Sequence, residues 1–193
     1  NCFNLNALAV RSPEGAFAPE PQMIDQFARL LALHGVPDQD AVRMAGRVAA
    51  RLVSSRTLFV YAREAREAAM IGDAVSLRLS PLLCALPVTA PMLYNVNTLR
   101  PDQAALVAAL LPRGADLQTV ARALAARPAQ GFAQPADLSA AAAGQLGTRT
   151  DWFVLDLDAR LGDAGMAERV LIDARARPVR LVRRVYGDPD AQR

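Results

Sequence analysis

The residues of this chain that could do chemistry are few and scattered. His34 is the only histidine, so Ser–His or Cys–His catalysis would have a single base to use. It stands just before Gly35 and Pro37, where a helix is expected to end, and this is typical of a structural or solvent-exposed histidine. No Gly-rich loop follows a strand with phosphate-binding spacing. We therefore predict no catalytic residues and no enzyme activity.

Three pairs of acidic residues could contribute to a calcium site, because Ca²⁺ takes six to eight oxygen ligands. They are Asp38 with Asp40, Asp156 with Asp158, and Asp188 with Asp190. The first pair suits helix capping, the second suits the solvent face of a strand, and the third lies in a terminal tail. None is accompanied by the Asn, Gly and Glu of a compact calcium loop, so these residues predict no metal and no other cofactor.

Cys2 and Cys84 are the only cysteines. Neither has the neighbouring His or Cys of a metal site. The two could pair in an oxidising compartment or remain as buried thiols, and the sequence leaves both alternatives open.

A phrase in which an aromatic residue, Asn, an aliphatic residue and Asn follow one another occurs twice. Its residues are Phe3, Asn4, Leu5 and Asn6, then Tyr94, Asn95, Val96 and Asn97, with Thr98 after the second copy. Asn side chains hydrogen-bond nearby backbone and are common at turns and caps. We expect Phe3, Asn4, Asn6, Asn95, Asn97 and Thr98 to form junctions where extended segments lead into helices; the alternative makes these Asn residues ligands or catalytic amides.

The composition bounds the kind of protein. The 193 residues are 52% hydrophobic but only 5% aromatic, which favours helices built from Ala and Leu. The net charge of +3, carried by Arg without any Lys, is too small to indicate nucleic-acid binding. No apolar run is long enough to span a bilayer. The chain begins at Asn1 without a Met, which we expect of an excised or processed fragment.

The hydrophobic pattern predicts a long helical block followed by strands. We expect a loop over residues 11–21, helices over 23–33 and 41–52, and Asp116 as the cap of a later helix. Asp38 and Asp40 are N-cap candidates for the second helix. The last residues predict three strands, the second and third over 167–175 and 179–186.

In the first of these strands, Trp152, Val154 and Leu157 are expected to oppose Asp156 and Asp158 across the strand. The lone strand FNLNAL at the front needs partners, and we expect it to join this C-terminal sheet. The fold class is therefore α+β. Residues 1–10 and 149–193 form a sheet domain, and residues 11–148 form a helical insertion.

Residues 95–138 resemble a helix-hairpin-helix (SAM-like) module, in which a Gly-rich hairpin contacts nucleic-acid phosphates through its backbone. Here the hairpin reads LPRGADL, with a single Gly114 and with Asp116 nearby. The phosphate-binding part is therefore degraded, and a DNA-binding module remains the alternative function.

A second resemblance covers nearly the whole chain. FNLNAL, LPVTAPMLYNVNT, a GF phrase at Gly131-Phe132 and the terminal WFVLDLDARL and VLIDARARPVRLVRRV occur in that order. Together they resemble the K-type minor pseudopilins of the type II secretion system. The resemblance implies a pseudopilin α/β domain with a large helical insertion, located in the periplasm and anchored in the inner membrane by an N-terminal helix absent here. It also implies I-type and J-type minor pseudopilins as partners in a pseudopilus tip that supports protein export, without nucleic acid.

The chain departs from this family at one place. Members usually carry an acidic stretch that supplies calcium ligands between their early and middle helices, but the corresponding residues 47–70 contain no Asp. Either the loop is lost in this lineage or residues are missing near Ser54-Ser55. No calcium ligands are therefore assigned.

Overall fold

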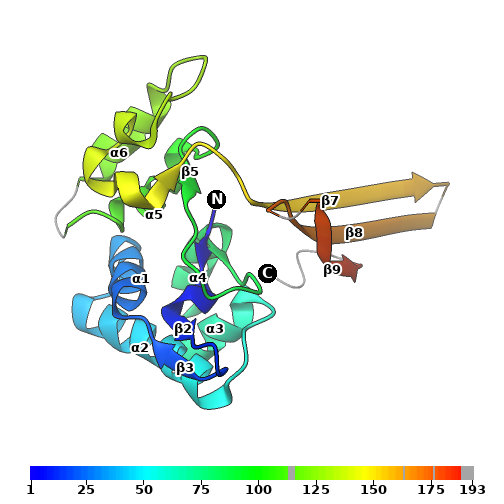
Figure 1. Ribbon diagram of the computed structural model, residues 1–193, viewed down its shortest axis with the longest axis horizontal. Coiled ribbons are helices and arrows are strands. Elements are labelled where there is room, and N and C mark those ends of the chain that lie inside the picture. Colours follow the sequence, from blue (N-terminus) through cyan, green and yellow to red (C-terminus); the bar gives the residue numbers. More distant parts are fainter. Residues whose placement is uncertain (113–115, 163, 176, 188–193) are drawn as a thin grey trace. The chain divides into compact units, whose positions relative to one another are not determined.

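The computed structural model describes residues 1–112, 116–162, 164–175 and 177–187. They divide into two compact units, Asn1–Thr148 and Arg149–Arg193. The first unit is mainly helical and the second is a sheet of long strands (Figure 1). This mixture confirms the predicted α+β class. The assignment of residues 1–10 and 149–193 to one pseudopilin domain, with 11–148 as its insertion, stays a prediction.

The first unit begins with a short extended segment that is almost completely buried. Strand β1 (Phe3–Asn4) runs into a 3-10 helix over Leu5–Leu8. Strand β1 pairs in parallel with β4 (Leu83–Cys84), Phe3 opposite Leu83 and Asn4 opposite Cys84. The prediction that FNLNAL joins the C-terminal strands was therefore wrong. A two-residue parallel pairing across about eighty residues of chain leaves no local pattern in the sequence.

Residues 9–19 form a β-hairpin. The loop predicted over residues 11–21 is therefore correct for the connection at 12–16 and wrong for residues 17–19, which form a strand. Strand β2 (Ala9–Arg11) pairs antiparallel with β3 (Phe17–Pro19). Gly15 has a φ of +86° in the connection, a conformation that glycine adopts without steric cost. Of the residues that indicated a loop, Pro13 and Gly15 lie in the connection, Pro19 ends β3, and Pro21 begins the helix that follows.

Four helices follow the hairpin and build the first half of this unit. They are α1 (Pro21–Leu33), α2 (Asp38–Ser55), α3 (Ala62–Ala69) and α4 (Asp73–Leu79). Pro21 opens α1 at its first position, where a missing N–H costs nothing. Helix α2 begins at Asp38 with Pro37 as N-cap and no side-chain cap, so Asp38 and Asp40 are not the N-cap residues we predicted. Both carboxylates lie in the first turn, where the helix dipole favours negative charge.

The second half of the unit consists of shorter elements. They are a 3-10 helix at Ser80–Leu82, β5 (Tyr94–Asn95), a 3-10 helix at Pro101–Gln103, α5 (Ala104–Ala108), α6 (Leu117–Ala125), 3-10 helices at Pro135–Asp137 and Ala140–Gln145, and β6 (Leu146–Gly147). Strands β5 and β6 pair in parallel. Asp116 caps α6 as predicted, accepting hydrogen bonds from the backbone N–H groups of Gln118 and Thr119. Gly114, the glycine of the predicted hairpin, lies outside the described residues.

One hydrophobic core holds the first unit together. Its buried members run from Phe3 to Leu146 along the sequence. Phe3 and Phe27 stack in it with ring centroids 5.3 Å apart. Because β1 and the following 3-10 helix place Phe3, Leu5 and Leu8 in this core, the start of the chain packs within the first unit.

The second unit is an antiparallel sheet in the order β7-β8-β9. Its strands are β7 (Trp152–Leu161), β8 (Ala164–Asp173) and β9 (Arg180–Tyr186). The pairing of β7 with β8 extends from Trp152 opposite Asp173 to Leu161 opposite Ala164 without a register shift. Strand β9 covers only part of β8, from Glu168 to Asp173, with an irregularity between Leu171 and Ile172.

Among the helices that the structure describes, none is long and apolar enough to cross a membrane.

Candidate functional site

The first Asn-containing phrase forms a buried junction between β1 and two distant segments. Asn6 accepts a hydrogen bond from the Phe59 N–H (2.9 Å) and donates to the carbonyls of Phe59 (2.9 Å) and Leu86 (2.8 Å). Asn4 accepts from the N–H groups of Asn6 (3.2 Å) and Leu86 (3.0 Å) and donates to the Val88 carbonyl (2.8 Å). The two amides therefore satisfy buried main-chain groups that no strand partner reaches.

A disulfide reinforces this junction. Cys2 and Cys84 are bonded, with Cα atoms 5.7 Å apart. Cys2 immediately precedes β1, and Cys84 is the residue of β4 opposite Asn4. The bond resolves the two alternatives left open by the sequence. It closes a loop between positions 82 residues apart, so the start of the chain is fixed covalently to the segment after α4.

The second Asn-containing phrase organises the turn into the 3-10 helix and α5. Asn95 accepts from the Asn97 N–H (2.9 Å), and the Thr98 hydroxyl donates to the Asn95 carbonyl (3.4 Å). Asn97 accepts from the Phe132 N–H (2.7 Å) and donates to the Phe132 carbonyl (3.1 Å). This junction therefore ties β5 to the GF phrase that follows α6.

Gly131 shows why the GF phrase begins with glycine. Its φ is +86°, and a Cβ at this position would stand 2.8 Å from Oδ1 of Asn97. That distance is far inside van der Waals contact, so the Asn97 amide can reach the Phe132 backbone only because residue 131 has no side chain.

Asn1, two residues before the first phrase, binds the second phrase, a contact that was not predicted from the sequence. Its side chain accepts from the Asn95 N–H (2.8 Å) and donates to the Asn95 carbonyl (3.4 Å) and the Thr98 hydroxyl (3.0 Å). Gln103 donates to the Asn1 carbonyl (3.1 Å). No local pattern could have indicated this contact, because it joins residues about ninety positions apart.

The chemistry of these junctions is that of hydrogen bonding. Carboxamides accept and donate without titrating near neutral pH, and burial raises the pKa of the neighbouring Tyr94 hydroxyl, which favours its neutral form. The arrangement fixes backbone geometry. It offers no nucleophile with an adjacent base among the residues just named.

The remaining candidate residues are dispersed. His34 lies at the C-terminus of α1, where its carbonyl accepts from Arg78 (2.9 Å), and burial with the nearby Arg78 charge lowers its pKa. Asp40 pairs with Arg43, and Asp156 pairs with Arg169. Asp188 and Asp190 lie outside the described residues.

The region that would carry the family's calcium loop does not fit a metal. Across the described parts of the chain, no three His, Cys, Asp or Glu side chains are grouped so that they could hold one. Between α2 and α3, Arg56 adopts a left-handed conformation, and Oε1 of Glu64 accepts from the Val60 and Tyr61 N–H groups. The nearest carboxylate is therefore engaged in capping α3.

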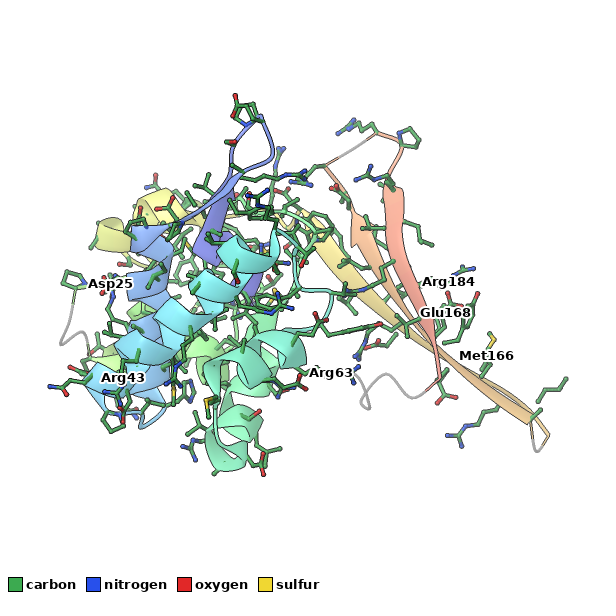
Figure 2. All side chains as sticks on the ribbon, turned by 90° about the horizontal axis from the view of Figure 1, so that it is seen from below. Asp25, Arg43, Arg63, Met166, Glu168 and Arg184 are labelled. Atoms are coloured by element: carbon green, nitrogen blue, oxygen red, sulfur yellow. A yellow bond between two sulfur atoms is a disulfide. The ribbon has the colours of Figure 1, made fainter. Side chains whose placement is uncertain are left out.

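The sheet of the second unit presents one mainly apolar face. Alternation and register place Phe153, Leu155 and Leu157 on this face together with Met166 and Leu181 of the neighbouring strands. We call this surface, completed by Leu161, Val170, Ile172 and Tyr186, the apolar sheet face. Its members on β7 are exposed, with Leu155 at 45% and Leu161 at 86%. The register also places the ion pair of Glu168 and Arg184 on this face, and Figure 2 labels the two residues next to each other.

The opposite face of the sheet is mostly charged. Trp152 and Val154 share it with Asp156 and Asp158, since residues two apart point the same way. The prediction that Trp152 and Val154 oppose the two aspartates was therefore wrong; Leu157 does oppose them. Asp173 on this face receives hydrogen bonds from the Arg175 guanidinium (2.9 and 2.8 Å).

Comparison with known proteins identifies the family. A type II secretion system protein K of Klebsiella pneumoniae is 30% identical over 96% of this chain and 67% of its own length. The chain belongs to the type II secretion system protein K family. The corresponding protein of Aeromonas hydrophila is 27% identical over 97% of this chain and 68% of its length. Both alignments, of 226 and 220 residues, are longer than the 193-residue chain, so protein K relatives have residues without a counterpart here.

Two further comparisons agree with this assignment. The family model described as type II secretion system protein K matches residues 94–156, which include the segment that resembled a helix-hairpin-helix module. The DNA-binding alternative is therefore not supported. A chain in the crystal structure of the GspK–GspI–GspJ complex from enterotoxigenic Escherichia coli has the same fold, with a TM-score of 0.74 at 21% identity over 97% of this chain and 76% of that chain.

Proposed function

We propose that this chain is the periplasmic part of a minor pseudopilin that assembles with I-type and J-type pseudopilins at the tip of the type II secretion pseudopilus. Membership of the protein K family carries the proposal, and a relative of the same fold occurs in a complex named for all three components. The protein acts by binding and not by catalysis. The rigid amide junctions suit such a role, because they hold surfaces in place.

The disulfide supports a location outside the cytoplasm. Disulfides persist in oxidising compartments such as the bacterial periplasm, and Cys2–Cys84 is one. An inner-membrane anchor preceding Asn1 is part of the proposal.

The apolar sheet face is the surface that this role would use. An exposed sheet face rich in Leu, Phe and Met is a typical helix-packing or protein-binding surface. In the assembled pseudopilus it would be covered by an apolar helix, from the anchor segment or from a partner pseudopilin.

The direct test is co-purification of this chain with the soluble domains of the I-type and J-type pseudopilins from the same genome. We expect a ternary complex at micromolar concentration by size-exclusion chromatography. Separate elution of all three proteins would contradict the proposal.

A matched pair of substitutions tests the surface in the full-length protein. Leu155 and Val154 are neighbours on β7 with similar exposure, 45% and 58%, but they lie on opposite faces. We expect Leu155→Asp to reduce secretion of an exported substrate severely and Val154→Asp to preserve it, with protein levels compared by immunoblotting. Equal secretion by both variants would exclude this face as the functional surface.

A further inference from the structure

The outer edge of β7 is a long and regular pairing surface. Strand β7 is an edge strand of ten residues, and among the strands described it pairs only with β8. Natural edge strands are blunted by shortness, charged side chains, Pro or bulges. Strand β7 contains no Pro, and its pairing with β8 has no register shift. The charged residues near its end, Asp158 and Arg160, are opposite in sign, so they can attract a second copy of the strand as well as repel other chains.

Strand β9 does not extend along the whole sheet, so the C-terminal end of β7 lies in a part with only two of the described strands. Strand β9 pairs with β8 only from Glu168 onwards, so residues 158–161 of β7 and 164–167 of β8 form a two-stranded ribbon. Leu161 is 86% exposed there, and Met166 is 51% exposed. Two-stranded ribbons are marginally stable in water, and a third and fourth strand stabilise them.

Residues 157–161 of β7 are complementary to the same residues of a second copy in one antiparallel register. When Ala159 stands opposite Ala159 of a second copy, Asp158 faces Arg160 of the other chain, twice by symmetry. In the same register Leu157 faces Leu161 on the apolar sheet face. If the two-fold axis lay one residue earlier, at Asp158, the two Asp158 side chains would stand opposite each other. If it lay one residue later, at Arg160, the two Arg160 side chains would do so.

Asp158 and Arg160 can give up their present contact with each other and pair with the other copy instead. Nε of Arg160 is 3.3 Å from Oδ1 of Asp158 in the same strand, and the two side chains are 80% and 64% exposed. Such an exposed pair contributes little to stability, so replacing it by two cross-strand pairs costs little.

We propose that two copies of this chain associate through the outer edges of β7, in the register that pairs Asp158 with Arg160 of the other copy. The association joins the two sheets into one, with a two-fold axis at Ala159. It is an interaction of this chain with itself, which goes beyond assembly with I-type and J-type pseudopilins.

The test is a charge exchange followed by sedimentation velocity from micromolar to millimolar concentration. Asp158→Arg alone and Arg160→Asp alone should each weaken self-association about tenfold, because each places like charges opposite one another. The double variant D158R/R160D should associate as the natural chain does. Mixing the two single variants should give a heterodimer, since every cross-strand pair is then attractive.

The mixing experiment separates this register from non-specific aggregation through the apolar sheet face, which would be insensitive to the exchange. Circular dichroism of each variant shows whether the sheet is intact. A natural chain that stays monomeric up to millimolar concentration would overturn the proposal. So would a mixture of the single variants that associates no better than either alone, whatever the result of co-purification with the I-type and J-type proteins.

Discussion

Individual carboxamides determine much of the backbone geometry in the first unit. Asn6 is completely buried and hydrogen-bonded to both backbone groups of Phe59 and to the Leu86 carbonyl. A side chain that satisfies three buried main-chain groups cannot be shortened without leaving them unpaired.

We predict that Asn6→Ala destabilises the protein by about 3 kcal/mol, since buried polar groups left without partners cost about 1 kcal/mol or more each. Urea denaturation followed by circular dichroism measures the change. Gln39→Ala, on the exposed side of α2, is the control and should leave the midpoint nearly unchanged. A similar small effect of Asn6→Ala would show that the junction does not contribute to stability.

Gly131 is a second residue with a specific requirement. We predict that Gly131→Ala destabilises the protein by about 2 kcal/mol, because it forces a side chain onto a positive φ and against the Asn97 amide. Gly46→Ala provides the comparison: that residue lies in α2 with no atom near its added Cβ. Alanine there should stabilise the helix by about 0.5 to 1 kcal/mol. Thermal unfolding of both variants would reveal effects of opposite sign.

At the scale of elements, the disulfide joins strands that have very little pairing of their own. Strands β1 and β4 are two residues long. The crosslink spans 82 positions, and a loop of that size restricts the unfolded chain by about 4 kcal/mol in the entropic model.

We therefore predict that the double variant C2S/C84S unfolds at a clearly lower urea concentration than the natural chain. The natural chain treated with a reductant should unfold at nearly the same concentration as the variant. The variant itself should not respond to the reductant. A double variant as stable as the oxidised natural chain would contradict the prediction.

The sheet contains one carboxylate whose titration should matter. Hydrogen bonds from Arg175, together with the charges of Arg175 and Arg180, lower the pKa of Asp173 to about 2. An aspartate in an unfolded chain has a pKa of about 3.9. The ionised form is therefore favoured by folding, and its contribution is present above about pH 4 and is lost as the pH falls towards 2.

We predict that the sheet loses stability between about pH 4 and pH 2 and that Asp173→Asn reduces this dependence. Trp152 is the only tryptophan, and the Arg175 guanidinium stands 4.6 Å from the centre of its ring. Its fluorescence therefore reports on this part of the sheet during urea denaturation at each pH. Asp158→Asn removes an exposed carboxylate from the same strand as Trp152 and serves as the comparison for the loss of one negative charge.

Elements with a strong local pattern could be predicted from the sequence. The helix predicted over residues 23–33 is Pro21–Leu33 in the structure, and Asp116 caps α6, since both depend on neighbours in the chain. The partner of β1 could not be predicted, because β4 is too short to have a pattern. The faces of β7 were assigned wrongly because apolar residues stand on both sides of its first half, so Phe153 and Leu155 were overlooked.

The junctions show the same limit. Asn is typical of turns and caps, so the two phrases indicated junctions, and Asn4, Asn6 and Asn97 do bind backbone groups. Which groups they bind depends on the packing of distant segments. Asn1 and Gln103 carried no signal at all.

For the whole molecule, the position of the hydrophobic core in the sequence indicates which part can fold alone. The core cluster of the first unit runs from Phe3 to Leu146, so all its members precede the boundary after Thr148. The second unit is a single three-stranded sheet with an exposed apolar face, and a sheet buries such a face by packing it against another layer.

We predict that residues 1–148 fold cooperatively without the rest, with a thermal midpoint close to that of the helical signal in the full chain. A chain of residues 11–148 is the decisive comparison, because it lacks β1, Cys2 and the buried Phe3, Leu5 and Leu8. It should be strongly destabilised. If both fragments are equally stable, residues 1–10 belong with the sheet and not with the helices.

The Cys2–Cys84 bond also makes the first part of the protein a covalent ring. Strands β2 and β3 and helices α1 to α4 all lie between the two cysteines. A protease that cuts one peptide bond within this ring leaves both products attached to each other as long as the bond is oxidised. Damage in the hairpin or in the helices of this half can therefore be tolerated without loss of a fragment, whereas a cut after Cys84 separates the chain.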